Sequence, residues 1–589
     1  MEINNIKNVL NSLREEFIII GLTGALGSGC TETAKILSAS ATKSKINSIL
    51  DSREKNEFDV EYRKIQRVKY FYENNEWEDF FHLRVSDLLF LLFINDVEDF
   101  SPFDSIFKDN SLDTITEIKA IGSRFIEAIS NYEKYQNNDL EEILALTNSY
   151  IKKSIDKSDN LYTNLFQEIG KNIRTTGYVF EEKDIDLANK LEVTDNYADL
   201  KIFIIPEIIR RVIKLIRKEN RVKNKKDFFV IDSLRNIYEI EFFRNRYQSF
   251  YLFSVMASPE IRQDRILNSF KLTVDDLDII KDFEKNDKGI ESQAINTCIG
   301  KGDVFIDNDI ENYNKTELSL QLIKYVALIR KPGLFTPSDD ERFMQVAFTA
   351  RYSSGCISRQ VGAVVAGADG YLRGFGWNDT PENHISCLYR TPEQLINADT
   401  NMVFSNYERS TTFRTHITNN FEGNKLKFHP YCFKDNQSQI ELTNSAEKIK
   451  HEIDLDDVKH EISQDNIKEI LNKAKFKNPT RERALHAEEN AFLQISKSGG
   501  ASVVSGTLFT TDSPCQLCAK KTMQLKISRV VYIDAYPDIS IEHTLKAGEE
   551  ENWPDFEMFA GVIGSAYFKL YVPMIGRKDE IKELGKLTN

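Results

Sequence analysis

Long apolar runs are missing from this 589-residue sequence. The strongest run, Leu88–Ile94 (LLFLLFI), is far shorter than the roughly 20 residues that a membrane-spanning helix requires. The first residues, MEINNIKNVLNSLREE, also lack the apolar stretch and small-residue cleavage site of a secretory signal. We therefore expect a soluble, cytoplasmic protein without a membrane partner.

An excess of positive charge is absent as well, and cysteine is scarce. Lys and Arg total 77 against 91 Asp and Glu, so the formal charge is -14, which disfavours a general grip on a nucleic-acid backbone. The seven cysteines are too few and too scattered for a disulfide framework, and they favour metal-binding or catalytic roles. Because 41% of the residues are hydrophobic, the chain can bury sizeable cores and is not disordered throughout.

Residues 1–330 are expected to form an α/β domain with a parallel sheet. Phe17–Leu22 (FIIIGL) is a continuous apolar run, as is typical of a buried parallel strand. Further short apolar runs, at Lys201–Pro206, Phe228–Asp232 and Ser249–Ser254, are separated by helical patterns, and this alternation predicts parallel strands. A short helix is expected over about 3–17, and residues 44–200 are interpreted as a mostly helical insertion.

A second domain, 338–589, is expected after the segment 331–337, which contains two prolines and a glycine. Ser338 and Glu341 have the spacing of a capping box, so a helix is predicted to begin there. The remaining expected elements are a β-hairpin over 361–377, a polar insertion over 379–480, helices from His486 and Cys515, and strands at 507–511, 529–535 and 568–572. This order predicts a compact three-layer α/β domain that carries a large insertion.

The sharpest constellation combines His486 with Pro514-Cys515-Gln-Leu-Cys518. Two thiols three residues apart at a helix start lie near unpaired backbone N–H groups, which favour thiolates. With His486 they provide three zinc ligands and leave the fourth position to a water, whose pKa zinc lowers to about 7. Glu488 is then placed to act as the catalytic acid and base. The competing interpretation is a structural zinc site beside a solvated glutamate.

A second cysteine and histidine pattern lies in the expected insertion. His384-Ile-Ser-Cys387 and His429-Pro-Tyr-Cys432 repeat the spacing H-x-x-C. Four nitrogen and sulfur ligands with no free position would form a closed, structural zinc site that holds a long insertion together. Two independent buried cysteines are the alternative.

A glycine-rich loop follows the first expected strand. It fits the phosphate-binding pattern G-x-x-x-x-G-K-[ST], except that Cys30 stands where the lysine belongs. Its backbone N–H groups are expected to hold the phosphates of a nucleotide, with Thr31 available to Mg²⁺, whereas the missing lysine argues against phosphoryl transfer. The residues of this predicted nucleotide site are Gly24, Gly27, Ser28, Gly29, Cys30 and Thr31. The strand ending in Asp232 resembles a Walker B strand, and Arg262 and Arg265 resemble the lid arginines of a nucleoside-monophosphate kinase.

Residues 338–575 resemble the CMP/dCMP-type zinc deaminase family. The resemblance rests on the zinc constellation, on Cys356-Ile-Ser-Arg359-Gln-Val-Gly362-Ala363 and on Gly376-Trp377-Asn378. It implies a three-layer α/β/α cytidine-deaminase-like fold, with Glu488 moving protons between the water, ring N3 and the departing amine, and with Asn378 hydrogen-bonded to the nucleotide. Ser354 and Arg359 are candidates for phosphate contact, although ordinary loop and strand-edge roles fit them as well. The long insertion after Asn378 departs from the family pattern near the expected sugar and phosphate.

A P-loop kinase-like domain fused to such a deaminase resembles bacterial anti-phage deoxycytidine nucleotide deaminases. The resemblance implies hydrolytic deamination of dCTP, and also of dCMP, which would deplete dCTP during phage infection. The N-terminal domain would sense a regulatory nucleotide or the infection state and restrain the deaminase, and a homo-oligomer is expected. An inhibitory partner fits this arrangement, but no sequence feature identifies it.

Three alternatives remain open. A dCMP deaminase of ordinary pyrimidine metabolism would carry the same zinc site. A deaminase that edits RNA or single-stranded DNA would need a basic, aromatic-lined channel, which the acidic composition disfavours. A non-catalytic regulator with a structural zinc would have no use for Glu488.

Overall fold

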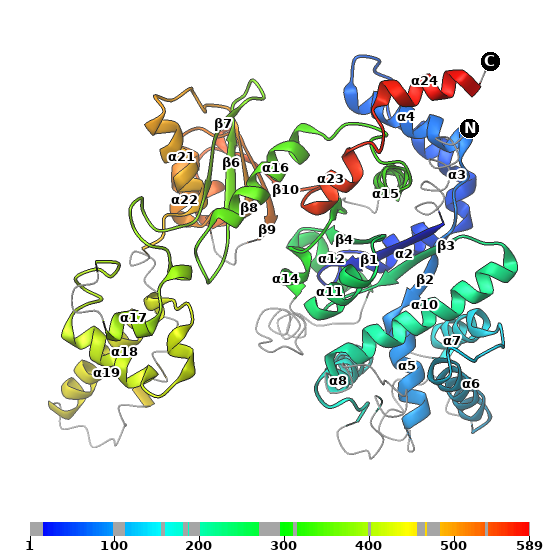
Figure 1. Ribbon diagram of the computed structural model, residues 1–589, viewed down its shortest axis with the longest axis horizontal. Helices are drawn as coiled ribbons and strands as arrows, with labels where there is room; N and C mark the ends of the chain where they lie inside the picture. Colours follow the sequence, from blue (N-terminus) through cyan, green and yellow to red (C-terminus); the bar gives the residue numbers. More distant parts are fainter. Residues whose placement is uncertain are drawn as a thin grey trace. The chain divides into compact units, whose positions relative to one another are not determined.

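The chain divides into two compact units. Unit 1 comprises Met1–Glu341 and Met558–Asn589, and unit 2 comprises Arg342–Glu557. The computed structural model (Figure 1) describes residues 16–97, 112–154, 160–180, 187, 201–269, 295–309, 315–397, 402–455, 466–467, 470, 483–535 and 540–587. The helix expected over 3–17 lies almost wholly outside these residues. The expected domain boundary needs one correction, because residues 558–589 belong with the first unit and not with the second.

Unit 1 is built on a six-stranded sheet with the order β11-β5-β4-β1-β3-β2. β1 pairs in parallel with β3 and β4, β2 with β3, and β4 with β5, whereas β11 runs antiparallel to β5. The strands are β1 (Phe17–Thr23), β2 (Phe81–Arg84), β3 (Asp227–Asp232), β4 (Phe250–Met256), β5 (Val304–Asp307) and β11 (Gly561–Val562). The predicted parallel sheet is confirmed, and β2 is a strand that was not expected inside the insertion.

The two faces of this sheet carry separate apolar cores. Ile19 of β1 points into one core, whereas Ile18 and Ile20 point into the other, as the two-residue period of a strand requires. Both neighbours are buried, which explains why β1 is apolar along its whole length. The first core includes residues of α5 (Val85–Asp96), α6 (Leu112–Ser130), α7 (Leu140–Ser154), α8 (Asn160–Thr176), α10 (Ile204–Lys223) and α11 (Ile237–Arg246). The second includes residues of α2 (Cys30–Ser38), α3 (Ser40–Leu50), α4 (Val60–Asn74), α15 (Lys315–Arg330) and α23 (Ser565–Tyr571).

Two expected strands are helical instead. Lys201–Phe203 forms a 3₁₀ turn, and α10 begins at Ile204, so the prediction of a strand over 201–206 was wrong. Pro206 sits in the first turn of α10, where its missing N–H costs nothing. The expected strand at 568–572 falls in α23, which begins at Ser565. In both cases a short apolar run lies within or at the end of a helix, and the length of such a run alone does not distinguish a strand from a helical segment.

Unit 2 contains a five-stranded sheet with the order β10-β9-β8-β6-β7. β6 (Gly362–Ala366) pairs antiparallel with β7 (Leu372–Trp377) and with β8 (Thr507–Asp512), and β8 pairs in parallel with β9 (Arg529–Asp534). β10 (Asp555–Met558) forms the edge beside β9. The predicted hairpin and the strands at 507 and 529 are therefore confirmed. The predicted capping box is also present, because the Ser338 and Glu341 side chains accept from each other's backbone N–H groups at the start of α16 (Asp339–Ala350).

The insertion after β7 has a hydrophobic core of its own. Figure 1 shows its helices, α17 (Pro392–Ile396), α18 (Thr411–Phe421) and α19 (Phe433–Leu455), grouped together. Their packed side chains are Leu395, Phe404, Phe413, Ile417, Phe421, Phe433 and Ile440. The ends of the insertion meet at an antiparallel bridge between Asp379 and Leu485. After the insertion, the chain thus returns to the end of β7 immediately before His486. Among the described helices, none combines the length and apolar character needed to cross a membrane.

Candidate active site

Two helix starts in unit 2 position the predicted metal ligands. His486 is the N-cap residue of α21 (Ala487–Lys497), and Cys515 is the N-cap residue of α22 (Gln516–Gln524), with Cys518 in the first turn of α22. α21 packs against β7 and β6, because Ala487 and Ala491 share a core with Ala363 and Val365. Small residues at these positions let the helix approach the sheet closely. The ligands are therefore held on packed elements and not on loops.

The three ligand atoms converge. The His486 Nδ1 atom lies 3.2 Å from the Cys515 Sγ atom and 3.4 Å from the Cys518 Sγ atom. Within the described part of the chain, these residues form the one group of three or more His, Cys, Asp or Glu residues whose ligand atoms all lie within 4.8 Å of one another. The hydrogen bond with the Cys518 thiol lowers the pKa of Cys515 to about 4, whereas the same bond and burial raise the pKa of Cys518. One imidazole nitrogen and two sulfurs at this spacing fit a zinc ion with one further coordination position.

Glu488 is buried beside these ligands. It lies in the first turn of α21, is 4% exposed, and lines the same cavity as His486 and Cys515. Burial raises the pKa of its carboxyl to about 7. A carboxyl group with a pKa near neutrality can take up a proton and release it again in one reaction cycle, which is what acid and base catalysis requires.

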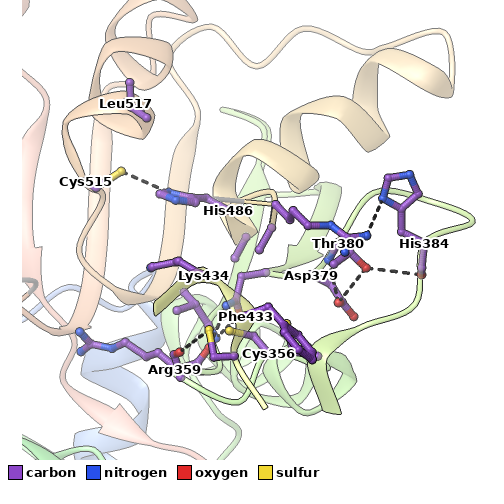
Figure 2. A pocket seen from close by; sticks show the side chains of 18 of the residues that line it. Cys356, Arg359, Asp379, Thr380, His384, Phe433, Lys434, His486, Cys515 and Leu517 are labelled. Carbon is purple, nitrogen blue, oxygen red and sulfur yellow. Dashed lines mark hydrogen bonds between the residues drawn. The ribbon is translucent and has the colours of Figure 1, made fainter. Parts of the chain in front are cut away.

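The cavity that contains these groups has a volume of about 910 Å³. Its walls come from the β6–β7 region, the insertion and the starts of α21 and α22, and Figure 2 labels residues from each of these parts. Binding sites for small molecules usually occupy about 300–1,000 Å³, so this volume admits a nucleotide.

Asn378 lines the cavity, but both ends of its side chain are engaged. Its Nδ2 donates to the Arg359 carbonyl oxygen at 2.8 Å, and its Oδ1 accepts from the Val361 N–H at 2.7 Å. Ser354 is buried and donates to the Asn378 carbonyl oxygen at 2.5 Å. These contacts hold Asn378 in the wall of the cavity, whereas Ser354 is not among the residues that line it.

Arg359 is also paired within the protein. Its Nε atom lies 2.7 Å from Asp512, and its Nη2 atom lies 2.5 Å from Asp534. Burial raises the pKa of Asp534 to about 7 and also raises the pKa of Asp512. Two carboxyl groups on one guanidinium leave Arg359 little positive charge to offer a phosphate.

The predicted second metal site of His384, Cys387, His429 and Cys432 is not assembled. The Cys387 thiol is hydrogen-bonded with Cys432, and this bond lowers the pKa of Cys387 to about 6. The two histidines are exposed, and His384 lies against Arg483. Cys356, which has no H-x-x-C partner in the sequence, lies close enough to Cys387 to influence the pKa of its thiol. The structure therefore brings two of the four predicted ligands, the Cys387 and Cys432 thiols, into contact, and the second zinc stays a prediction.

In unit 1 the glycine-rich loop joins β1 to α2. Gly27 and Gly29 have positive φ values of 82° and 99°, a conformation that glycine adopts without strain. Cys30 is the first residue of α2; burial raises its pKa to about 12, so its thiol carries no charge. Burial works against ionisation of Asp232, but hydrogen bonds from His82 and Thr31 outweigh it and hold its pKa below the ordinary value. Thr31 therefore lies beside the carboxylate at the end of β3.

The two predicted lid arginines of unit 1 contact the same loop. Arg262 Nη1 reaches the Leu26 carbonyl oxygen at 3.5 Å, and Arg265 Nη1 reaches the Gly27 carbonyl oxygen at 3.4 Å. Arg265 Nη2 also donates to the Asn308 carbonyl oxygen at 2.7 Å. Both arginines therefore lie beside the loop, on α12 (Pro259–Ser269).

The sequence alone did not single out a charged cluster in the cavity wall of unit 2. Arg390, Glu408 and Arg483 line the cavity and form mutual ion pairs. Most of the insertion lies between Arg390 and Arg483 in the sequence, so no spacing pattern joins them. The available signal was Arg483, a cation three residues before His486.

Comparisons with known proteins agree with this site. A family model for the cytidine and deoxycytidylate deaminase zinc-binding region matches residues 444–534. The deoxycytidylate deaminase of Enterobacteria phage T4 is 24% identical over 195 residues, which cover 33% of this chain and 76% of that protein. The dCMP deaminase of cyanophage S-TIM5, in complex with dCMP and dUMP, is 19% identical over 38% of this chain and 99% of its own, with a TM-score of 0.20.

A diaminohydroxyphosphoribosylaminopyrimidine deaminase and reductase from Thermotoga maritima is 16% identical over 39% of each chain, with a TM-score of 0.18. At such scores the solved structures add no weight, and the assignment rests on the family match and the geometry. The C-terminal part of the chain carries a zinc-binding region of the cytidine and deoxycytidylate deaminase type, and its chemistry is that of a zinc-dependent hydrolytic deaminase.

Proposed function

We propose that unit 2 deaminates deoxycytidine nucleotides, dCTP and also dCMP, to the corresponding deoxyuridine nucleotides. The observation that carries this proposal is the buried Glu488 carboxyl beside His486, Cys515 and Cys518 in a cavity of about 910 Å³. A structural zinc site needs neither the carboxyl nor the cavity. The name of the T4 phage relative, a deoxycytidylate deaminase, supports the substrate class.

Glu488 has the central catalytic role. His486, Cys515 and Cys518 would hold a zinc ion, which when bound would supply a water that loses a proton near neutral pH. Glu488 would accept one proton of this water and pass it to N3 of the cytosine ring while the water oxygen bonds to C4. It would then accept the second proton from the new C4 hydroxyl and deliver it to the amine, which leaves as the C4–N bond breaks. The burial of Glu488 keeps bulk water from exchanging with the proton in transit. Each proton taken from water is thus returned to the substrate, and the products are a uracil ring and ammonia.

Asn378 is proposed to contact the nucleotide while it orders the wall. An amide nitrogen carries two hydrogens, and one of them is used by the Arg359 carbonyl oxygen. The second can donate to the sugar or the base. This dual role would fix the Arg359–Val361 segment and the substrate with the same side chain.

The direct test compares substrates. Purified protein is incubated with dCTP, dCMP, CTP and a cytosine-containing oligonucleotide, and uracil and ammonia are measured for the wild type and for Glu488→Ala. We expect wild-type activity on the deoxycytidine nucleotides and none in the variant. Activity confined to dCMP would favour an enzyme of ordinary pyrimidine metabolism, activity confined to the oligonucleotide would favour a base-editing deaminase, and no ammonia from any substrate would refute the enzyme.

We further propose that the deaminase acts in antiviral defence by depleting dCTP. Support comes from the fusion of a deaminase region to a second α/β unit, which resembles anti-phage deaminases. Cells that express the wild type should lose dCTP after phage infection and restrict phage yield, whereas cells that express Glu488→Ala should do neither. Unchanged dCTP in infected wild-type cells would contradict this role.

Unit 1 is proposed to be a P-loop nucleotide-binding domain that regulates unit 2. Its support is the loop between β1 and α2, the two left-handed glycines, and Thr31 beside Asp232, where Mg²⁺ would bind. The uncharged Cys30 offers no cation to a transferring phosphoryl group, so binding without transfer is expected. Substitution of Gly29 and Thr31 should abolish nucleotide binding and change the regulation of deamination. If it alters neither, the regulatory role is wrong.

A second zinc is proposed on the Cys387 and Cys432 thiols, with Cys356 as the neighbouring third thiol. The low pKa of Cys387 favours the thiolate that a metal needs. Metal analysis of Cys432→Ser should then show one zinc fewer per chain than the wild type, with the deaminase zinc retained. Equal zinc in both proteins would exclude this site.

A further inference from the structure

Arg390 and Glu408 of the insertion and Arg483, which follows it, form one charged cluster in the wall of the deaminase cavity. Arg390 Nη1 lies 2.9 and 3.1 Å from the two carboxylate oxygens of Glu408. Arg483 Nη1 lies 3.1 and 2.9 Å from the same two oxygens. Two guanidinium groups on one carboxylate leave a net positive charge on the cluster.

The cluster is anchored from its buried side. Arg390 is 1% exposed and lies over the rings of Phe404 and Phe433, at 5.5 and 5.1 Å from their centroids. Glu408 accepts from the Ser405 N–H at 2.8 Å. Burial favours the protonated form of Glu408, but the two arginines and this N–H outweigh burial and lower its pKa, so the carboxylate stays ionised. The geometry is therefore fixed before any ligand arrives.

Arg483 is the member of the cluster that solvent reaches. Its side chain is 29% exposed, against 1% for that of Arg390. Arg483 Nη2 lies 3.3 Å from the Nδ1 atom of His384. A guanidinium has no acceptor, so Nδ1 of His384 accepts this bond and its Nε2 carries a hydrogen that can be donated elsewhere. Figure 2 shows His384 near Thr380, with His486 between them and Cys515 in this view.

The position of Arg483 along the chain brings it within reach of a bound nucleotide. Arg483 precedes His486 by three residues, which span at most about 10–11 Å. Arg359 also lines the cavity, but two carboxyl groups, Asp512 and Asp534, share its guanidinium, whereas Arg390 and Arg483 share the single carboxylate of Glu408. An anionic group that extends from a cytosine at Glu488 is therefore attracted to the Arg483 side.

We propose that Arg483, held by Glu408 and assisted by His384, binds the phosphates beyond the first in the nucleotide substrate. This inference rests on the proposed deamination of deoxycytidine nucleotides and assigns the residue that selects a triphosphate over a monophosphate. Bidentate guanidinium contacts suit phosphate oxygens, and the pairing with Glu408 orients the guanidinium at no cost when substrate binds. Arg483 acts in binding and takes no part in the bond changes at C4.

The test measures kcat and KM of the zinc-loaded protein for dCTP, dCMP and deoxycytidine, with wild type and Arg483→Gln. We expect kcat/KM for dCTP to fall about 10- to 100-fold through KM, with smaller loss for dCMP and none for deoxycytidine. Arg529→Gln is the matched control, because Arg529 has the same 29% side-chain exposure and an ion pair with Glu557 but does not line the cavity. An equal loss on all three substrates, or no loss on dCTP, would overturn the inference.

A second measurement does not depend on the folding of a variant. Inorganic tripolyphosphate should inhibit wild-type deamination of deoxycytidine or dCMP at concentrations where inorganic phosphate does not, and Arg483→Lys should weaken this inhibition. Equal inhibition by both anions would count against the cluster as a polyphosphate site. If the wild type deaminates none of the three substrates, the proposed function itself fails, and this result is distinct from activity without phosphate selectivity.

Discussion

Gly376 of β7 lies directly against the Ala487 carbonyl group of α21, so that a Cβ atom added at Gly376 would overlap the Ala487 oxygen and the Ala491 nitrogen. Ala487 stands between His486 and Glu488. The absence of a side chain at Gly376 therefore sets how closely α21, with His486 at its start and Glu488 in its first turn, approaches the sheet.

Gly376→Ala is expected to lower both stability and activity. Overpacking of this kind costs about 1–3 kcal/mol, and a shift of α21 would displace His486 and Glu488 together. Thermal unfolding and dCMP or dCTP turnover check this expectation. Gly300→Ala is the control, because an added Cβ there would meet its nearest atoms at 3.6 and 3.7 Å, an ordinary contact distance. Equal stability of the two variants would show that α21 can move without cost.

Glu488→Gln should retain zinc and fold but lose turnover. The amide has the same size but cannot accept and release the proton, so kcat should fall at least 10²- to 10⁴-fold. Glu489→Gln is the neighbouring control, since Glu489 pairs with Lys521 at 2.5 Å outside the catalytic chemistry. Ammonia release and zinc content are measured on the same samples, and a Glu488→Gln enzyme with more than a tenth of wild-type turnover would remove the carboxyl from the mechanism.

Cys515→Ser should lose the metal. The Cys515 thiol, with its pKa of about 4, is ionised at neutral pH, whereas a serine hydroxyl stays protonated. The variant therefore lacks one of the three metal ligands. We expect about one zinc fewer per chain and no deamination. Cys298→Ala, a buried cysteine of unit 1, should leave the zinc content unchanged. Full zinc occupancy in Cys515→Ser would place the ion elsewhere.

Asp534 predicts a pH dependence of stability. Burial raises its pKa from 3.8 to about 7, so the folded state holds a proton that the unfolded state has released over this range. The contribution of this bound proton to the free energy of unfolding is fully present below the ordinary pKa of the carboxyl and is lost as the pH rises through about 7. The wild-type Tm should thus fall between pH 5 and pH 8 by about 2–4 °C more than that of Asp534→Asn.

The exposed Asp555 at the edge strand provides the comparison for this experiment. Asp555→Asn should follow the wild-type profile when unfolding is recorded across the same pH series. Parallel profiles of Tm against pH for all three proteins would mean that the pKa of Asp534 is the same in the folded and the unfolded state.

Thr31→Val should weaken binding of a magnesium nucleotide to unit 1 by about tenfold, because the hydroxyl that serves the ion is lost. Thr31→Ser keeps the hydroxyl and the hydrogen bond to Asp232, so its affinity should match that of the wild type. Calorimetric titration with Mg–ATP and Mg–dCTP measures the affinities of the two variants. Identical affinities for the Val and Ser variants would mean that Thr31 does not contact the ion.

Local chemistry made much of the fold and the site predictable. The zinc triad with Pro514 and the capping box of Ser338 and Glu341 are each recognisable from a few neighbouring residues. The apolar patterns of the predicted strands agree with their burial; these strands are β1, β3, β4, β6, β7, β8 and β9. Parts of α10 and α23 were predicted as strands because each contributes an apolar run of only five or six residues, which has the length of a strand.

Long-range pairings were not accessible in the same way. The thiols of Cys387 and Cys432 meet, but their H-x-x-C histidines do not, since spacing says nothing about which side chains a fold turns inward. The pairing of Arg390 and Arg483 with Glu408 depends on how the insertion packs on its own apolar core.

Two hydrogen bonds to Glu341 affect how unit 2 unfolds. The Glu341 carboxylate accepts from the Val562 N–H at 2.9 Å and from the Tyr571 hydroxyl, so the points where the chain leaves unit 1 and re-enters it are fastened together. An unfolded unit 2 would remain a closed loop and not a free chain, with fewer conformations to gain on unfolding. Cutting the chain near residue 558 should therefore destabilise the deaminase without removing a single contact inside it.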